Sequence, residues 1–226
     1  MTHARFAIYH LPDGALGDLG SAWLGWDART GTVPDRPEIA GLPAAATSLT
    51  SIPMRYGFHA TLKAPFRLAE GHSVEDLARR TELVCDRLAP FEMDLDMHCD
   101  WGFVMLRPRQ QSPALTALEQ ALVTRLDDLR APLLPEDRAR RRPDQLPEKA
   151  RAHLDNWGYP FVLDLFNYHL TLSNGLPAPE AQAVQDALAP VFAPLIEVPM
   201  QVRSVALVGE ADDGRLQLIR DIPLRG

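Results

Sequence analysis

The sequence predicts an α+β fold in which helices pack on antiparallel sheets, arranged as two pseudo-symmetric lobes around a central cleft. Strand-like and helix-like segments alternate irregularly, unlike the regular order of βαβ units. Segment 198–224 has the pattern of an antiparallel hairpin with the turn signal ADDG at 211–214. One pattern, an aromatic residue near His-x-Thr-Leu, occurs twice, in YGFHATLK (56–63) and FNYHLTLS (166–173), each followed by a helix pattern. We therefore expect residues 1–226 to form a single bilobal domain.

The N-terminal elements follow from composition and punctuation. RFAIYHLP (5–12) is rich in β-forming residues and predicts an opening strand. Residues 15–28 predict a short helix in which Trp23 and Trp26 serve as core anchors. The segment 31–54 is rich in Pro, Gly, Thr and Ser, which indicates an irregular loop.

The first motif begins the next group of elements. GFHATLKAPFRL (57–68) alternates between apolar and polar residues as a strand does. Ser73 is placed to cap a helix over 73–90, whose apolar face would comprise Val74, Leu77, Leu83, Val84 and Leu88. Segment 91–108 predicts two strands around a turn near Asp100.

The second half repeats the strand and helix order. Segment 112–133 predicts a helix that Ser112 caps, with apolar residues at Leu115, Leu118, Leu122, Val123, Leu126 and Leu129. Segment 161–175 begins mixed and becomes an alternating strand, and 177–192 predicts another helix. An insertion at about 133–160 separates the helix of segment 112–133 from the strand of segment 161–175, and it contains the basic run EDRARRRPDQLPEKAR (136–151). We interpret it as a solvated helical or loop segment; the alternatives are a phosphate-reaching arm or a lid over the cleft.

Composition narrows the class of protein. The formal net charge of −7 argues against broad nonspecific binding to nucleic acid, which requires many cations. No apolar run approaches the roughly 20 residues of a membrane helix, and the Met1 end lacks the regions of a secretory signal, so we expect a cytoplasmic protein without membrane contact. Cys85 and Cys99 form no CxxC pair and are expected to be buried thiols. No stable protein partner is implied.

The repeated motif places the same chemistry on two strands. Side chains alternate along a strand, so His59, Thr61 and Lys63 would share a polar face. His169, Thr171 and Ser173 would do the same in the second copy. Imidazole has a pKa of about 6.5, so one neutral and one protonated histidine can act as general base and general acid on a phosphodiester. The threonine hydroxyls could donate hydrogen bonds to phosphoryl oxygens. This chemistry needs no metal and no cofactor.

Other catalytic sites have weaker support. Two histidines with two hydroxyls are a poor ligand set for zinc, although Asp164 could complete one. The sequence has neither the GxSxG motif of serine hydrolases nor a Walker or GxGxxG loop for nucleotides.

The motif pair HATL (59–62) and HLTL (169–172) resembles the 2H phosphoesterase superfamily, which is named for two H-x-T/S motifs. The wider RYGFHATLKAPF (55–66), RFAIYHLP and WLGWD (23–27) resemble a bacterial branch associated with phosphonate-utilisation operons. The resemblance implies a two-lobed fold with one motif per lobe. It also implies that His59 and His169 act as acid and base, in an order left open, while Thr61 and Thr171 bind phosphate.

We therefore expect a metal-independent phosphodiesterase that hydrolyses a small ribose-derived cyclic phosphate. Two alternatives stay open: a 2′,3′-cyclic phosphodiesterase acting on an RNA end, and a noncatalytic protein that binds a phosphorylated metabolite or RNA end. Lys63 and Ser173 are candidates to extend phosphate contact, and Arg55 and Tyr56 lie just upstream of the first motif as further substrate-binding candidates. Tyr9 and Tyr168 could stack on a base or sugar, or pack in the core.

Overall fold

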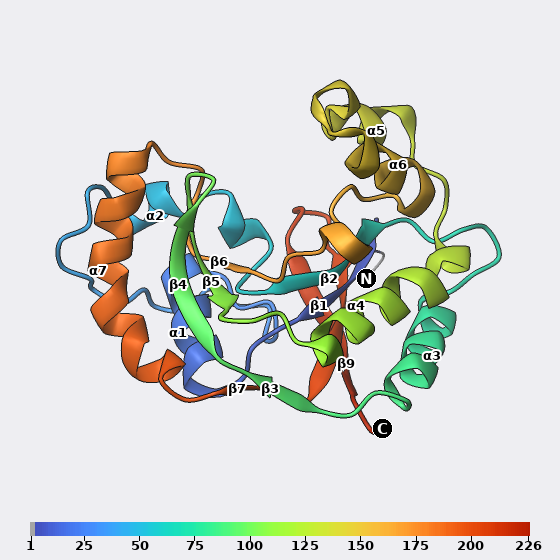
Figure 1. Cartoon of the computed structure of the whole chain (residues 1–226), viewed down its shortest axis with the longest axis horizontal. Coiled ribbons are helices and arrows are strands. Elements are labelled where there is room, and N and C mark those ends of the chain that lie inside the picture. The colour runs from blue at the N-terminus through green and yellow to red at the C-terminus, as the bar shows by residue number, and fades with distance from the viewer. Residues whose placement is uncertain (1–2) are drawn as a thin grey trace.

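The computed structural model describes residues 3–226 and has antiparallel sheets with packed helices, which confirms the α+β class (Figure 1). The first sheet has the strand order β2-β1-β8-β9, and all its neighbouring strands are antiparallel. Its strands are β1 (Phe6–His10), β2 (Ala60–Phe66), β8 (Ser204–Glu210) and β9 (Leu216–Pro223). The predicted C-terminal hairpin is therefore present as β8 and β9.

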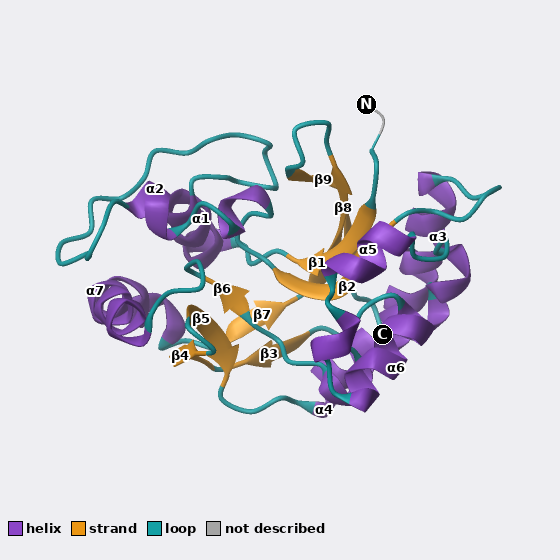
Figure 2. Ribbon diagram, turned by 90° about the horizontal axis from the view of Figure 1, so that it is seen from above, coloured by secondary structure: helices purple, strands orange, loops and turns teal. Residues whose placement is uncertain are grey.

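A second sheet and a two-stranded ladder complete the β structure (Figure 2). The second sheet has the order β4-β5-β6, with β4 (Leu95–Asp100), β5 (Phe103–Pro108) and β6 (Leu170–Thr171). The ladder pairs β3 (Phe91–Met93) with β7 (Met200–Val202). Segment 91–108 thus forms three strands where the sequence predicted two.

The helices divide between the two sheets. α3 (Val74–Cys85) contacts β9 and α4 (Pro113–Arg125) contacts β2, while α7 (Ala178–Ile196) contacts β4, β5 and α1 (Gly14–Leu24). The remaining helical segments are α2 (Ala46–Leu49), α5 (Pro135–Arg140), α6 (Glu148–Trp157), η1 (Pro53–Arg55), η2 (Asp127–Leu129), η3 (Pro143–Gln145) and η4 (Leu163–Leu165). Within residues 3–226, none of the helices has the length and apolar character needed to span a membrane.

Local signals explain where the helices begin. The Ser73 hydroxyl accepts a hydrogen bond from the backbone of Asp76, whose carboxylate accepts one from the backbone of Ser73, so a capping box starts α3. Ser112 caps α4 in the predicted way. The predicted apolar face of α3 is wrong at Leu83, which is 58% exposed. Thr81 is buried instead, because its hydroxyl donates to the carbonyl of Leu77 within the helix.

Both motif strands lie at sheet edges. β2 is an edge strand of the first sheet and β6 is an edge strand of the second. The lobes do not correspond to halves of the sequence, as the strand and helix order had suggested. β4 and β5 precede the insertion yet share a sheet with β6, which pairs with β5. In the first sheet, β8 returns from the C-terminal part to pair with β1, and β9 lies beyond it. The chain therefore crosses between the lobes, so neither can fold from a contiguous half.

One buried apolar cluster joins both sheets, since it includes Ile8 and Leu207 of the first and Leu106 and Leu170 of the second. Trp23 is fully buried in it, and its indole N–H donates to the carbonyl of Leu172, 2.7 Å away. The same cluster contains Cys85, whereas Cys99 is half-buried, and both thiols are free. The core thus fixes one sheet against the other.

Candidate functional site

Both motif histidines are held in the same way. Nδ1 of His59 lies 2.9 Å from the carbonyl oxygen of Gly57, and Nδ1 of His169 lies 2.8 Å from that of Asn167. A carbonyl can only accept, so Nδ1 carries the proton in each neutral ring and Nε2 is the basic nitrogen. Nε2 of His59 lies 3.3 Å from the Thr61 hydroxyl. Each histidine is thereby oriented by the carbonyl two residues before it.

The first of these carbonyls depends on a glycine. Gly57 has a φ of 74°, in the left-handed region that residues with a Cβ rarely adopt. A Cβ at this position would also lie 2.9 Å from the Cβ of Ala28. The turn before the first motif therefore requires glycine, and that turn aims the carbonyl at His59.

One cavity is lined by residues of both motifs, although His59 itself is not among the lining residues. Thr61 of the first motif and His169 and Thr171 of the second line a cavity of about 620 Å³. Its remaining walls are mostly apolar and comprise Leu62, Ala64, Trp101, Phe103, Met105, Glu119, Tyr159, Phe161, Val162, Leu165, Phe166 and Asn167. We call this cavity the motif cleft. A cavity of this size fits a small ligand, for which pockets of about 300–1,000 Å³ are usual.

The pKa values of both motif histidines are lowered. Burial lowers the pKa of His59 to about 4, the hydrogen bond to Gly57 partly opposes this, and the charge of His169 lowers the pKa further. Burial also lowers the pKa of His169, and Arg107 adds to that effect. Both imidazoles are therefore predominantly neutral at pH 7 in the free protein.

Tyrosine side chains surround the first histidine. The ring of Tyr9 stacks on His59 with centroids 3.9 Å apart and planes 21° from parallel. The ring of Tyr56 lies 6.2 Å from His59 and is tilted. Tyr168 instead packs in the core, where its hydroxyl lies 2.6 Å from Nδ1 of buried His10. Both stacking candidates are therefore buried core residues, and Tyr9 in addition contacts His59.

The expected position of Lys63 is wrong. Thr61 pairs with Tyr9 and Lys63 pairs with Ile8, so a β-bulge breaks the alternation between them. The bulge turns Lys63 to the opposite face, where Nζ donates to the carbonyl of Val123 at 3.0 Å and pairs with Asp127 at 3.3 Å. Burial lowers the pKa of Lys63 to about 8, although Asp127 opposes this. Lys63 therefore anchors α4 and does not share the His59 face.

Two other candidates lie away from the motif cleft. Ser173 is buried, accepts a hydrogen bond from the backbone N–H of Val104 and donates one to the carbonyl of Asn174. Both hydrogen bonds hold the backbone, so the residue is occupied structurally. Arg55 is exposed, and its guanidinium lies beside Gly214 in the turn between β8 and β9.

Two residues near the site carried no sequence signal. By the register that pairs Met105 with Thr171, Arg107 lies across from His169 and also pairs with Asp100 at 2.6 Å. Glu119 is fully buried, lines the motif cleft and accepts hydrogen bonds from the backbone N–H of Leu163 at 3.0 and 3.2 Å. Leu163 has a φ of 57°, so Glu119 holds a left-handed turn shortly before the second motif. Only the pairing of distant segments reveals either residue.

Asp164, the possible third metal ligand, lies outside this arrangement. It pairs with Lys149 and with His153, both in the insertion. Within residues 3–226, no group of three or more His, Cys, Asp or Glu side chains is placed to hold a metal ion.

The chain matches one protein family and two curated proteins. The family described as "Protein of unknown function (DUF1045)" matches residues 61–217. A protein of Janthinobacterium sp. (strain Marseille) named "Ribose 1,5-bisphosphate phosphokinase PhnN" is 34% identical over 184 residues, which are 80% of this chain and 41% of that protein. A protein of the same name from Laribacter hongkongensis (strain HLHK9) is 34% identical over 174 residues, 76% of this chain and 40% of that protein. The chain thus spans about two-fifths of the length of these relatives.

Solved structures are also similar to the chain. A structure titled as a phosphoesterase aligns with a TM-score of 0.39 and 18% identity, over 99% of each chain. E. coli LigT complexed with phosphate aligns with a TM-score of 0.41 and 17% identity, over 100% of each chain.

The buried carboxyl group of Glu119 generates a testable pH dependence. Burial raises its folded-state pKa from 4.5 to about 7, although the Leu163 N–H and Lys63 oppose this. Below pH 4.5 the group is protonated in both states and its contribution to stability is fully present. As the pH rises towards 7, the unfolded chain ionises first, so the free energy of unfolding falls.

We predict that Glu119→Gln removes this fall in the free energy of unfolding between pH 4.5 and about 7, because glutamine does not ionise. The amide oxygen still accepts a hydrogen bond from the backbone N–H of Leu163. Urea denaturation of both proteins at several pH values should show the variant gaining stability relative to the wild type across that window. A stability difference that stays constant with pH would contradict the prediction.

Proposed function

We propose that this chain, which belongs to the family described as "Protein of unknown function (DUF1045)", is a phosphodiesterase that hydrolyses a small ribose-derived cyclic phosphate. The observation that carries the proposal is that Thr61 of the first motif lines the same cavity as His169 and Thr171 of the second, although the two motif strands belong to different sheets. Each motif histidine uses the same Nδ1 anchor, which leaves Nε2 as the basic nitrogen. A core histidine would not need this repeated orientation.

The geometry supports a two-histidine acid–base mechanism. One neutral histidine takes a proton from water through Nε2 while the water oxygen attacks phosphorus. The P–O bond to one sugar oxygen breaks, and the other histidine, in its protonated form, donates a proton to that oxygen. The product is a phosphate monoester. After the reaction the first histidine is protonated and the second is neutral, and proton exchange with solvent restores the starting state of both histidines. We infer that Thr61 and Thr171, which line the motif cleft, donate hydrogen bonds to the phosphoryl oxygens as negative charge shifts onto them. The scheme proceeds without a metal.

The general acid must gain its proton in the presence of substrate. Both histidines have lowered pKa values in the free protein because burial disfavours their charged form. A cyclic phosphodiester carries a negative charge, which favours the protonated imidazole when it binds between the two rings. Substrate binding would thus supply the condition that the acid needs.

The names of the relatives support a ribose phosphate as the substrate class. The kinase name belongs to whole proteins of which this chain spans 41% and 40%. The chain has no GxxxxGK[ST] loop, so we infer that the named kinase resides in their unmatched part. A cyclic phosphate joining O1 and O2 of ribose 5-phosphate would give ribose 1,5-bisphosphate when the bond to O2 breaks. Such a hydrolase would supply the compound in the relatives' name, in keeping with the resemblance to phosphonate-linked proteins.

A second candidate is supported by the rim of the motif cleft. Trp101, 68% exposed, and Phe161, 49% exposed, both line the cavity. Exposed aromatic rings can stack on unpaired bases, which is how many proteins hold single-stranded nucleic acid. This observation favours an RNA end with a 2′,3′-cyclic phosphate as the alternative substrate.

Histidine replacement tests the chemistry. We predict that His59→Ala and His169→Ala each lower turnover of ribose 1,2-cyclic phosphate 5-phosphate by about 10²–10⁴-fold, because each removes one proton-transfer step. Product formation is measured by ³¹P NMR with and without EDTA, and circular dichroism confirms folding. Hydrolysis that persists in both variants, or that requires added metal, would refute the mechanism. A wild type that binds phosphate esters without hydrolysing them would instead identify a noncatalytic binding protein.

The pH–rate profile tests the electrostatics. The profile of kcat/KM reports the free enzyme, in which the pKa of His59 is about 4 and that of His169 lies below 6.5. The singly protonated pair is therefore most populated below pH 6.5 and declines above it. We predict that kcat/KM falls by about tenfold per pH unit above neutrality, whereas kcat declines at higher pH because bound substrate raises both pKa values. A kcat/KM maximum on the alkaline side of neutrality would contradict this assignment.

Trp101→Ala separates the two substrate classes. If a base stacks on Trp101, the variant should lose about tenfold or more in kcat/KM for an oligonucleotide with a cyclic-phosphate end, since each stacked base contributes about 1–3 kcal/mol. Hydrolysis of the ribose substrate should stay at the wild-type rate. We expect the wild type to hydrolyse the ribose substrate faster than the oligonucleotide. We also expect Trp101→Ala and the wild type to hydrolyse the oligonucleotide at the same rate. A wild type that prefers the oligonucleotide, together with a variant that hydrolyses it more slowly, would establish the RNA-end activity.

A further inference from the structure

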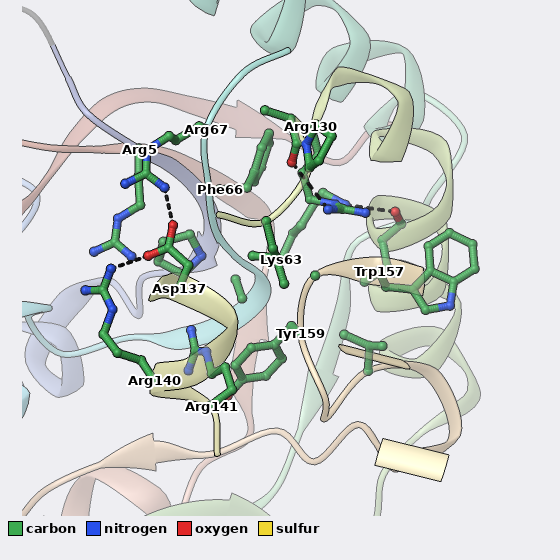
Figure 3. Close-up of a pocket in the computed structure, with 18 of the residues that line it drawn as sticks. Arg5, Lys63, Phe66, Arg67, Arg130, Asp137, Arg140, Arg141, Trp157 and Tyr159 are labelled. Carbon is green, nitrogen blue, oxygen red and sulfur yellow. Dashed lines mark hydrogen bonds and ion pairs between the residues drawn. The ribbon is translucent and has the colours of Figure 1, made fainter. Parts of the chain in front are cut away.

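A second cavity, of about 180 Å³, adjoins the motif cleft and is strongly cationic (Figure 3). Its lining includes one carboxylate, Asp137, and the cationic side chains Arg5, Lys63, Arg67, Arg130, Arg140 and Arg141. We call it the arginine pocket. A protein with a net charge of −7 gathers these cations at one place, which points to an anionic ligand.

The arginine pocket is assembled from separate segments. Arg5 precedes β1 and Arg67 follows β2, so both belong to the first sheet. Arg140 ends α5 and Arg141 follows it, so the insertion supplies the other side. Figure 3 shows Arg5, Arg67 and Arg140 gathered around Asp137, with Arg141 beside Tyr159. The insertion therefore contributes Asp137, Arg140 and Arg141 to the lining of this pocket.

Most of these cations already have partners. Arg5 pairs with Glu210 at 2.6 Å, Arg130 pairs with Asp127 at 2.9 Å, and Lys63 pairs with the same aspartate. Asp137 is bound by both Arg67 and Arg140.

Arg141 is different. Among residues 3–226 it takes part in no ion pair, and its guanidinium lies 4.8 Å from the centroid of the Tyr159 ring. A half-buried guanidinium that is held by stacking and has its N–H groups available is suited to bind a phosphate.

The two cavities are neighbours. Ala64, Tyr159 and Val162 line both of them. Buried Tyr9 lies near both sites, because its ring stacks on His59, and Arg5 and Arg141 oppose the rise of its pKa that burial causes. By strand alternation Arg5 and Tyr9 point to the same side of the first sheet. One small molecule can therefore reach from the motif cleft into the arginine pocket.

We propose that the arginine pocket binds a phosphate monoester carried by the same substrate whose cyclic diester lies between His59 and His169, and that Arg141 makes this contact. The inference rests on the proposed function, and it makes the second phosphate a determinant of specificity. The pocket volume of about 180 Å³ suits a single phosphate group, since pockets for whole ligands are larger, about 300–1,000 Å³.

A small bisphosphorylated sugar fits these features better than an RNA chain. RNA binding along a backbone needs a continuous cationic track, whereas the six cations here line one small pocket. A purely structural role for the arginines, fastening the insertion to the first sheet, accounts for Arg67 and Arg140 through Asp137. It does not account for Arg141.

Arg141→Gln tests the proposal, with Arg142→Gln as the matched control. Both variants remove one positive charge at adjacent positions, and Arg142 is exposed and does not line the arginine pocket. We measure kcat/KM for ribose 1,2-cyclic phosphate with and without a 5-phosphate. Arg141→Gln should lose about 10- to 100-fold on the 5-phosphorylated substrate only, because a charge-assisted hydrogen bond to the phosphate is removed. Arg142→Gln should behave as the wild type does on both.

Equal losses on both substrates, or no loss on the 5-phosphorylated one, would overturn the proposal. An equal loss on a cyclic-phosphate-ended oligonucleotide would overturn the assignment to a small substrate. A direct binding measurement distinguishes failure of the phosphate-binding proposal from failure of the proposed phosphodiesterase function. Ribose 5-phosphate, which has no diester to hydrolyse, should bind the wild type and His169→Ala equally by calorimetry and bind Arg141→Gln at least about tenfold more weakly. Equal binding to wild type and Arg141→Gln would refute the pocket even if the chain hydrolyses cyclic phosphates.

Discussion

The hydrogen bond between buried His10 and the hydroxyl of Tyr168, 2.6 Å long, fixes the distance on which the site depends. His10 pairs with Ala60, which follows His59, and Tyr168 directly precedes His169. Because both partners are buried, separating the two motifs would leave polar groups unsatisfied in the core. The motif strands lie at the edges of different sheets, so no backbone ladder joins them and side-chain contacts must set their spacing.

Burial gives the site its geometry and also works against its charge. The carbonyls of Gly57 and Asn167 orient the two imidazoles, and burial of the rings lowers both pKa values. A site built this way holds two neutral histidines until an anion enters. The negative charge of a phosphodiester then favours the protonated ring that can act as the acid. Selectivity for an anionic substrate and the supply of the acid thus have one physical cause.

The insertion adds charge to a fold whose net charge is negative. Most of its ionic groups are paired, for example Arg138 with Asp155 and Lys149 with Asp164, which agrees with a solvated helical segment. Its arginines around Asp137 form part of the arginine pocket next to the motif cleft. Arg67 connects the insertion to the first sheet through Asp137. The insertion therefore carries cations and, through Asp137, holds some of them beside the first sheet.

The sequence by itself determined the elements and the motif residues, because periodicity and capping act over a few residues. The sequence was sufficient to predict the α+β class, the helix starts at Ser73 and Ser112, and the occurrence of a histidine and a threonine in each motif. Only the tertiary structure decided where the cations lie. The bulge that turns Lys63 away arises from pairing with Ile8, and the arginine pocket joins segments far apart in the chain. Such contacts depend on strand register and packing between distant elements, which leave no local pattern in the sequence.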